Sequence, residues 1–350
     1  MLLYISEDTF TGPATADTAT AIRYALTSRE WGYSSLLVTP GAPQAARLQG
    51  LDEQLAAGLD IAQRGWLEGQ TLLETLSRVV ALVDDVDRHG SQRGNMFEVA
   101  TSFAVASGVF REPVLVTENM ATDGAFLSMI FSLWNQRDEA DLERFWNVRL
   151  EQGGGDTIRN YVGRYAGQPE PMAIVCDRDS VALPQCGNTV KNCVSDILAH
   201  GLFACRDTAK AGGFTPLRSN FAFEITDAWS VESLIFPNIS QLLLRETMNV
   251  AEVRDRMDSL AGTFPTFPRL DDASAESWLS TNFRTFHNGS SAWNSNSVQR
   301  FTAWVRAGTV SRAEAQSAFD QDYRIAPFRR AMDKVCNTLV ALGVRDHRLL

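Results

Sequence analysis

Apolar runs of strand length alternate with segments of helical spacing along the N-terminal part of the chain. Residues 2–5 and 35–39 are short apolar runs that predict buried strands, and residues 14–31 carry apolar side chains on one helical face. The same spacing predicts further helices over residues 44–62, 67–88 and 96–107. Residues 1–110 are therefore expected to form an N-terminal α/β region.

The alternation continues through the centre of the chain. Apolar runs predict strands at residues 114–117, 147–150, 172–176 and 221–225, and helical spacing predicts helices at 124–134, 138–145, from 157, and 190–200. Nearly continuous apolar strands are typical of a parallel sheet covered on both faces. The predicted fold class is α/β, with a mostly parallel sheet flanked by helices over residues 111–240, the N-terminal α/β extension over 1–110, and a helical C-terminal region over 241–350.

Composition and charge narrow the classes of function. The chain has 350 residues, of which 45% are hydrophobic, and it can bury a large core. Its net charge of −10 disfavours general coating of nucleic acid, so any such contact would be local or metal-assisted. No run reaches the roughly 18 apolar residues of a membrane span, and the start of the chain lacks the pattern of a secretory signal. Five cysteines without framework spacing predict a reduced, cytoplasmic protein.

Acidic residues follow two of the predicted central strands. Glu118 comes directly after the run 114–117 and is followed by Asp123, while Asp177 and Asp179 come after the run 172–176. In open α/β sheets, ligands bind at the carboxyl ends of the strands, where these acids would meet. Carboxylates gathered around a hard cation such as Mg²⁺ suit phosphodiester hydrolysis, because the cation activates water and clamps phosphoryl oxygens.

A glycine triplet lies between these two strands. Its backbone N–H groups could cradle a phosphate at the start of the following helix, with Gly154 and Gly155 as the candidate positions. A tight strand-to-helix turn explains the triplet equally and is the favoured interpretation. Arg159 and Arg178 are candidate phosphate contacts, as is Arg164, although each taken singly is better explained as a surface residue.

Other chemistries find little support in the sequence. One Cys/His group, made up of Cys186, Cys193, His200 and Cys205, is spaced too widely for a structural zinc site. Buried or incidental thiols are the favoured interpretation of its cysteines. The remaining histidines have no serine or cysteine partner in a nucleophile motif. The chain contains no Gly-Lys pair, which excludes a P-loop.

The order of the acidic and glycine-rich pieces resembles the TOPRIM domain of topoisomerases, bacterial primases and old-family nucleases. The pieces are VLVTENMATDGAFL (114–127), VRLEQGGGDTIRNYV (148–162), MAIVCDRDS (172–180) and FAFEITDAWSVESLIF (221–236). The last piece resembles the tail of a TOPRIM-like family encoded near ATPases in bacterial anti-phage loci. The resemblance covers residues 112–240 and departs from the family at Asn119, where a glycine is usual, and in the longer spacing to Asp123.

The resemblance implies roles for particular residues. Glu118 would be a metal ligand or general acid/base, Asp177 and Asp179 would bind Mg²⁺, or Mn²⁺ in its place, and Asp123 would be a further catalytic acid. Glu232 would be an additional metal ligand. The resemblance also implies a nuclease acting on DNA or RNA in bacterial antiviral defence, a separate ATPase partner and a homo-oligomer such as a dimer. The lack of an apolar run of membrane length predicts no membrane contact.

Two other functions are compatible with the sequence. One is a catalytically silent TOPRIM-like module that acts by binding a partner ATPase. The other is a PIN-like ribonuclease, suggested by Glu7, Asp8 and Glu98 together with the Val-Thr-Glu-Asn of residues 116–119. A PIN-like site would leave Asp177 and Asp179 without a role.

Overall fold

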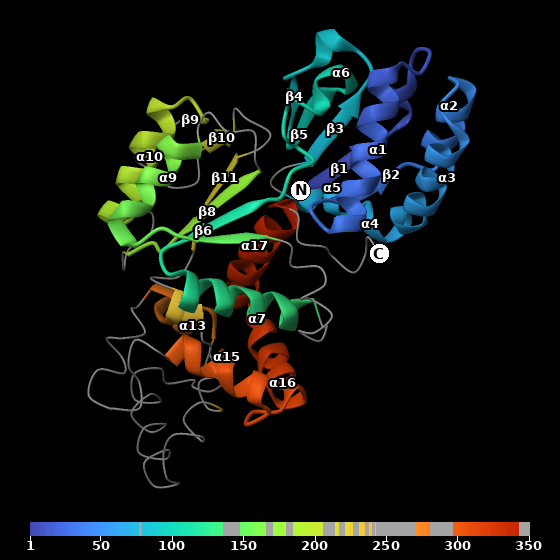
Figure 1. Ribbon diagram of the computed structural model, residues 1–350. Coiled ribbons are helices and arrows are strands. Elements are labelled where there is room, and N and C mark those ends of the chain that lie inside the picture. Colours follow the sequence, from blue (N-terminus) through green and yellow to red (C-terminus); the bar gives the residue numbers. More distant parts are fainter. Residues whose placement is uncertain are drawn as a thin grey trace, which may run out of the picture.

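The part of the chain that the structure describes forms two larger, mostly parallel sheets, a short antiparallel pair of strands and a set of C-terminal helices (Figure 1). The structure is a computed structural model and describes residues 1–76, 79–135, 148–165, 171–179, 185–205, 214–216, 221–226, 231–234, 238–239, 242, 271–280 and 297–342. The predicted α/β class, with helices flanking the sheets and a helical C-terminal region, is confirmed.

The N-terminal sheet has five strands in the order β2-β1-β3-β5-β4. β1 (Leu2–Ile5), β2 (Ser35–Val38), β3 (Val79–Val83) and β5 (Met96–Ala100) are parallel, and β4 (Gln92–Arg93) is antiparallel. The helical elements are η1 (Glu7–Phe10), α1 (Ala16–Trp31), α2 (Ala42–Leu48), α3 (Glu53–Ala62), η2 (Gln63–Gly65), α4 (Trp66–Gly69), α5 (Leu72–Thr75), η3 (Val86–Arg88) and α6 (Thr101–Ala104). The strands predicted at residues 2–5 and 35–39 and the helix at 14–31 are confirmed.

Two helices predicted in this region are wrong. The segment 67–88 contains two single-turn helices and then β3, and the segment 96–107 begins as β5 before α6. Every residue of β3 is buried, because the strand lies between β1 and β5 in the middle of the sheet. A strand buried on both faces has no polar alternation, so its apolar spacing also fits a helix face. The predicted helix 44–62 is divided into α2 and α3.

The second sheet has four parallel strands in the order β11-β8-β6-β7. They are β6 (Val114–Thr117), β7 (Arg149–Gln152), β8 (Met172–Cys176) and β11 (Phe221–Ile225). The predicted central strands are confirmed, except that the strand predicted at residues 147–150 lies two residues later. Between and around them lie the π-helix η4 (Met120–Gly124), α7 (Ala125–Trp134), η5 (Gly155–Ile158), α9 (Arg159–Tyr165), α10 (Asn188–Ala199), the antiparallel pair β9 (Phe203–Cys205) and β10 (Phe214–Pro216), and η6 (Val231–Leu234). The predicted helix 138–145 lies outside the described residues.

Helices cover both faces of the second sheet. Along β6, Leu115 belongs to a core shared with α7 and α17, whereas Val114 and Val116 belong to a core shared with α9 and α10. Successive strand residues point to opposite faces, so this division places α9 and α10 on one side and α7 and α17 on the other (Figure 1). The interior strands β6 and β8 are therefore fully enclosed.

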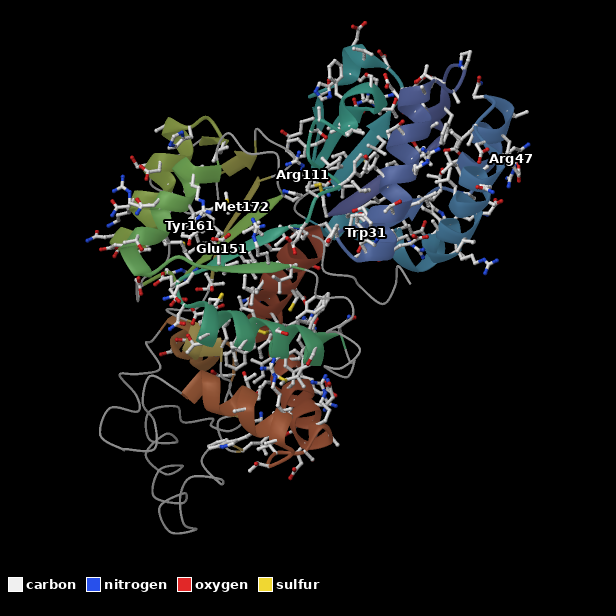
Figure 2. All side chains as sticks on the ribbon, viewed as in Figure 1. Trp31, Arg47, Arg111, Glu151, Tyr161 and Met172 are labelled. Carbon is white, nitrogen blue, oxygen red and sulfur yellow. The ribbon has the colours of Figure 1, made fainter. Side chains whose placement is uncertain are left out.

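The edge strand β7 is protected by charge. Its Arg149 lies 3.5 Å from Glu112 and 3.3 Å from Glu151, and Glu151 also lies 3.6 Å from Arg164. Glu151 is labelled in Figure 2. Charged side chains on an exposed edge discourage pairing with a strand of another molecule.

The C-terminal helices are α13 (Asp272–Ser280), α15 (Ser297–Ala307), α16 (Arg312–Tyr323) and α17 (Ala326–Leu342). α17 reaches both sheets: Lys334 Nζ donates to the Ile225 carbonyl at 2.8 Å, and the Met1 nitrogen donates to the Leu342 carbonyl at 2.6 Å. One core cluster contains Leu2, Leu115 and residues of α17 together. The three regions therefore share buried surface. None of the helices described is both long enough and apolar enough to cross a membrane.

Candidate acidic site

The site is built at the carboxyl ends of β6 and β8. These strands are parallel neighbours, in register at Val116 and Ile174, so Glu118 and Asp177 leave adjacent strand ends. The Asp177 backbone N–H donates to the Glu118 carboxylate. From β6 the chain continues to β7 on one side and later to β8 on the other. Such a change of direction is where open α/β sheets form a ligand crevice.

Glu118 is held in an unfavourable environment for a carboxylate. Burial raises its pKa from 4.5 to about 7, and the charges of Asp179, Asp123 and Asp156 add to this, while the Asp177 N–H opposes it. Its buried Oε1 has no hydrogen-bond partner, and neither has the buried Oγ1 of the preceding Thr117. Buried polar atoms are rarely left unpaired, so the Glu118 oxygen is the candidate contact for a ligand at this strand end.

The turn after β6 does not need the glycine that the family resemblance implies. Asn119 has an extended backbone (φ −132°), which any residue can adopt. Its Oδ1 accepts the N–H groups of Ala121 and Thr122 at 3.1 and 3.3 Å, and so caps η4. Asp123 returns the contact, because its Oδ2 accepts the Asn119 N–H at 2.8 Å and its Oδ1 accepts the Thr122 hydroxyl at 2.9 Å. Asp123 thus shapes the turn while its charge acts on Glu118.

The turn after β8 is equally constrained. Asp177 Oδ1 accepts the Val231 N–H at 2.9 Å, which fastens η6 to this strand end. Asp179 has φ 52°, and it is the only residue other than glycine with a left-handed backbone in the described parts of the chain. Gly187 packs so closely that a Cβ there would lie 2.4 Å from Asp179 Cβ. Such backbone strain, of order 1–3 kcal/mol, concentrates at functional sites.

The glycine triplet acts as the strand-to-helix turn. Gly153 N–H donates to the Thr117 carbonyl at 2.7 Å, and Gly154 N–H donates to the Glu118 carbonyl at 2.8 Å. Gly154 and Gly155 both have left-handed backbones, with φ of 68° and 58°. The Gly154 N–H, a candidate phosphate donor in the sequence, is therefore already bonded to the Glu118 carbonyl.

The predicted phosphate-binding arginines differ in their surroundings. Arg159 forms a two-point ion pair with Asp196, with both N–O distances 2.8 Å, as expected of a surface residue. Arg178 is only 5% exposed, so its interpretation as a surface residue is wrong. Its carbonyl accepts the Gly187 N–H at 2.6 Å, which ties it into the turn that carries Asp179.

Gly153→Ala is expected to destabilise the protein by about 1–3 kcal/mol, because the new Cβ would lie 2.4 Å from Ile158 Cγ1 and 2.7 Å from its Cβ in a filled core. The matched control is Gly163→Ala in α9, where the nearest atom would be 3.4 Å away and where alanine favours the helix. Urea unfolding of both variants measures the difference. Equal stability of the two would contradict the packing described at Gly153.

Asp156 is a site residue that the sequence reading missed. It follows the glycine triplet directly, and its charge reaches Glu118. The sequence signal for Asp156 was its position directly after a glycine turn that follows a predicted strand. The acids of the site therefore come from the ends of β6, β7 and β8.

In the described parts of the chain, the acids do not form a closed metal centre. Among the described residues, no three His, Cys, Asp or Glu side chains are close enough together to hold a metal ion as they stand. Glu232 lies in η6, next to the Val231 that Asp177 holds, but its side chain is outside the described parts. The acids are thus neighbours at one sheet edge and form an open cluster.

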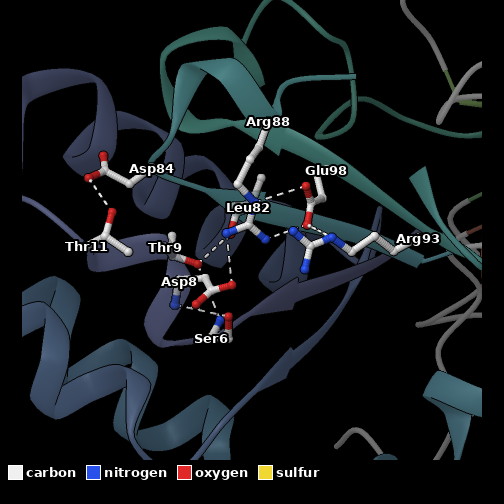
Figure 3. Close-up of polar contacts among 9 residues, drawn as sticks. All are labelled: Ser6, Asp8, Thr9, Thr11, Leu82, Asp84, Arg88, Arg93 and Glu98. Atoms are coloured by element: carbon white, nitrogen blue, oxygen red, sulfur yellow. Dashed lines mark hydrogen bonds and ion pairs between the residues drawn. The ribbon is translucent and has the colours of Figure 1, made fainter. Parts of the chain in front are cut away.

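The acidic residues of the N-terminal sheet have arginine or hydroxyl partners, in contrast to the buried oxygen of Glu118. Glu98 is buried and is paired with Arg88 and, at 3.3 Å, with Arg93, and Arg88 also lies 3.0 Å from Asp8 (Figure 3). Glu7 accepts the Thr39 hydroxyl at 2.9 Å. These partners give the acids of the PIN-like alternative structural roles.

The cysteines of the second sheet are packing residues. Cys176 and Cys193 are buried side by side and hydrogen-bonded, and this contact, with burial, raises the pKa of the Cys176 thiol. Cys186 is partly buried against the same core. The interpretation as buried thiols is confirmed for Cys193, and the side chain of Cys205 is outside the described parts.

The chain was compared with protein-family models, with curated proteins and with solved structures, and none of the three comparisons gave a match.

Proposed function

We propose that this protein is a divalent-cation-dependent nuclease of the TOPRIM kind, which hydrolyses phosphodiester bonds of DNA or RNA. One observation carries the proposal. Glu118 has a buried oxygen without a partner, and the acids that raise its pKa come from adjacent ends of parallel strands. Carboxylates gathered at the carboxyl ends of parallel strands are the ligands that Mg²⁺ or Mn²⁺ prefers.

The acids of the site have different roles in this proposal. A bound cation would supply positive charge for the phosphoryl oxygens and lower the pKa of a water molecule. Asp179 and Asp177 are the acids that would hold it. Glu118, with a pKa of about 7, can accept or give a proton near neutral pH, as a general acid or base requires. The Asp177 N–H fixes the orientation of the Glu118 carboxylate.

The resemblance to the anti-phage TOPRIM-like family extends the proposal. It suggests bacterial antiviral defence as the setting, a separate ATPase as regulator, and a dimer as the working form. These three suggestions rest on the resemblance of residues 112–240 alone.

Cleavage of plasmid DNA and of single-stranded RNA tests the proposal. The full chain is expected to cleave one of them in Mg²⁺ or Mn²⁺ and not in EDTA. Asp179→Asn should lower the rate by about 100-fold or more, because it removes a cation ligand without changing side-chain size. The control is Asp60→Asn in α3, an acid paired with Arg47 in the N-terminal region, and it should leave the rate unchanged.

The open geometry of the acids favours one alternative, a catalytically silent module that acts by binding a partner. Calorimetric titration with Mn²⁺ separates the two functions. A folded protein that binds no Mn²⁺ and cleaves neither substrate would overturn the nuclease proposal and support the silent module.

A further inference from the structure

The outward face of α1 carries two large aromatic side chains. The inward face packs on the N-terminal sheet through Ala21 and Ile22, which belong to the same core as the buried residues of β1. Tyr24 and Trp31 lie seven residues apart, so they leave the helix in nearly the same direction. Their side chains are 46% and 59% exposed. The helix therefore presents apolar surface on the side that faces away from its own core.

Both aromatic rings are held in place by neighbouring rings. The Tyr24 ring stacks on Phe110 with the ring centroids 6.1 Å apart, and the Trp31 ring meets Tyr33 edge to face at 5.7 Å. Trp31 is labelled in Figure 2, at the C-terminal end of α1. A side chain that is already ordered loses little conformational freedom when a partner covers it, and tyrosine and tryptophan are enriched among the residues that dominate binding at protein interfaces.

Two threonines complete a seam along this face of α1. Thr20 and Thr27 alternate with Tyr24 and Trp31, and the steps between successive members are four, three and four residues. This is the heptad spacing by which one helix packs along another. If two copies of the helix lie antiparallel, Tyr24 of each faces Thr27 of the other, and Trp31 of each faces Thr20 of the other. Each large ring then meets a small side chain, so the seam is complementary to itself.

The charges beside the seam favour a second copy of this chain in the antiparallel direction. Arg23 and Glu30 are exposed, lie seven residues apart and flank the seam on the same side. In the antiparallel pair, Arg23 of each copy lies beside Glu30 of the other, which gives two ion pairs of opposite charge across the contact. In a parallel pair these two residues would stay about two helical turns apart. The antiparallel direction also places the positive end of each helix dipole beside the negative end of the other.

We propose that the seam formed by Thr20, Tyr24, Thr27 and Trp31 joins two copies of this chain in an antiparallel dimer with two-fold symmetry. A two-fold contact uses the same surface on both copies, and the self-complementary seam meets that requirement. The seam contains none of the acids of the candidate site and lies outside residues 112–240, so the inference depends on neither the proposed nuclease function nor the family resemblance. One pair of 16-residue helices, each about 24 Å long, is a small interface, so the dimer is expected to dissociate at about 1–10 μM.

Analytical ultracentrifugation of the full chain, from about 0.1 to 100 μM, measures the dimer affinity and tests the seam. Trp31→Ala is expected to weaken the dimer about tenfold or more, because it removes a central aromatic contact from both copies. Arg23→Glu should weaken it by a similar factor, since it sets two carboxylates side by side at each ion pair. Adding Glu30→Arg to Arg23→Glu exchanges the two charges and should restore the natural affinity to within about threefold. The control is Leu67→Ala in α4, a side chain that is 76% exposed, and it should leave the dimer unchanged.

A natural protein that stays monomeric over the whole concentration range would overturn the proposal. So would a dimer whose affinity is the same in Trp31→Ala and Arg23→Glu, because a different surface would then join the two copies. If the exchange of both charges leaves the dimer as weak as Arg23→Glu alone does, the antiparallel pairing is wrong. Restored affinity in the double variant requires a folded chain, so this comparison decides the question even if Trp31→Ala proves less stable in urea than the natural protein.

Discussion

Glu118→Gln is expected to be more stable than the natural protein by about 2 kcal/mol at a pH of about 8. The folded state raises the pKa of Glu118 from 4.5 to about 7, because the carboxylate is partly buried and lies among other acids. Each pKa unit corresponds to about 1.4 kcal/mol, and we reduce the sum because Glu118 is partly exposed to solvent. Glutamine keeps the size of the side chain and an acceptor for the Asp177 N–H but carries no charge.

The sign of this effect depends on pH. The neutral carboxyl of Glu118 suits the folded state, so its contribution to stability is present below a pH of about 4.5 and is lost as the pH rises through about 7. The difference in the free energy of unfolding between Glu118→Gln and the natural protein should therefore grow across that pH interval. Urea unfolding at several pH values measures this difference in stability. Glu151→Gln, a partly buried acid paired with two arginines, is the control and should gain nothing. A pH-independent gap would contradict the described environment of Glu118.

Asp322→Asn is expected to show the largest pH-dependent change in stability. Asp322 is fully buried in α16, and its carboxylate accepts the backbone N–H groups of Asn238 and Ile239 at 3.3 and 3.4 Å and the Asn238 side-chain amide at 2.5 Å. Burial raises its pKa from 3.8 to about 7, although these hydrogen bonds oppose the rise. The difference is about three units, which corresponds to about 4 kcal/mol.

The contribution of Asp322 is present below a pH of about 4 and disappears as the pH rises to about 7, because ionisation of the buried carboxyl penalises the folded state. Relative to Asp322→Asn, the natural protein should therefore lose about 4 kcal/mol of stability between these two pH values. Unfolding by urea at each end of the interval gives the number. Asp320→Asn is the matched control in the same helix, since Asp320 is partly exposed and bonded to Gln316. Parallel pH profiles of the natural protein and Asp322→Asn would refute this account.

The two sheets differ in how well their strands could be predicted. Strands β6 and β8 are followed by acids, which mark their ends, and both were predicted at their observed positions. Strand β3 was predicted as part of a helix, because a strand buried on both faces shows no alternation of polar and apolar residues. Its formation as a strand depends on pairing with β1, which lies far from it in the sequence, and with β5, which follows after a short connection.

The chain order of Glu118, Asp177 and Asp179 after apolar strands was enough to predict acids at one edge of a parallel sheet. That prediction needs only parallel strands, and the alternation of strand and helix segments along the sequence already indicates them. The contribution of Asp156, the replacement of the expected glycine by the capping side chain of Asn119, and the fastening of η6 by Asp177 all depend on which strand lies beside which. Such contacts join segments separated along the chain, and only the tertiary structure brings them together.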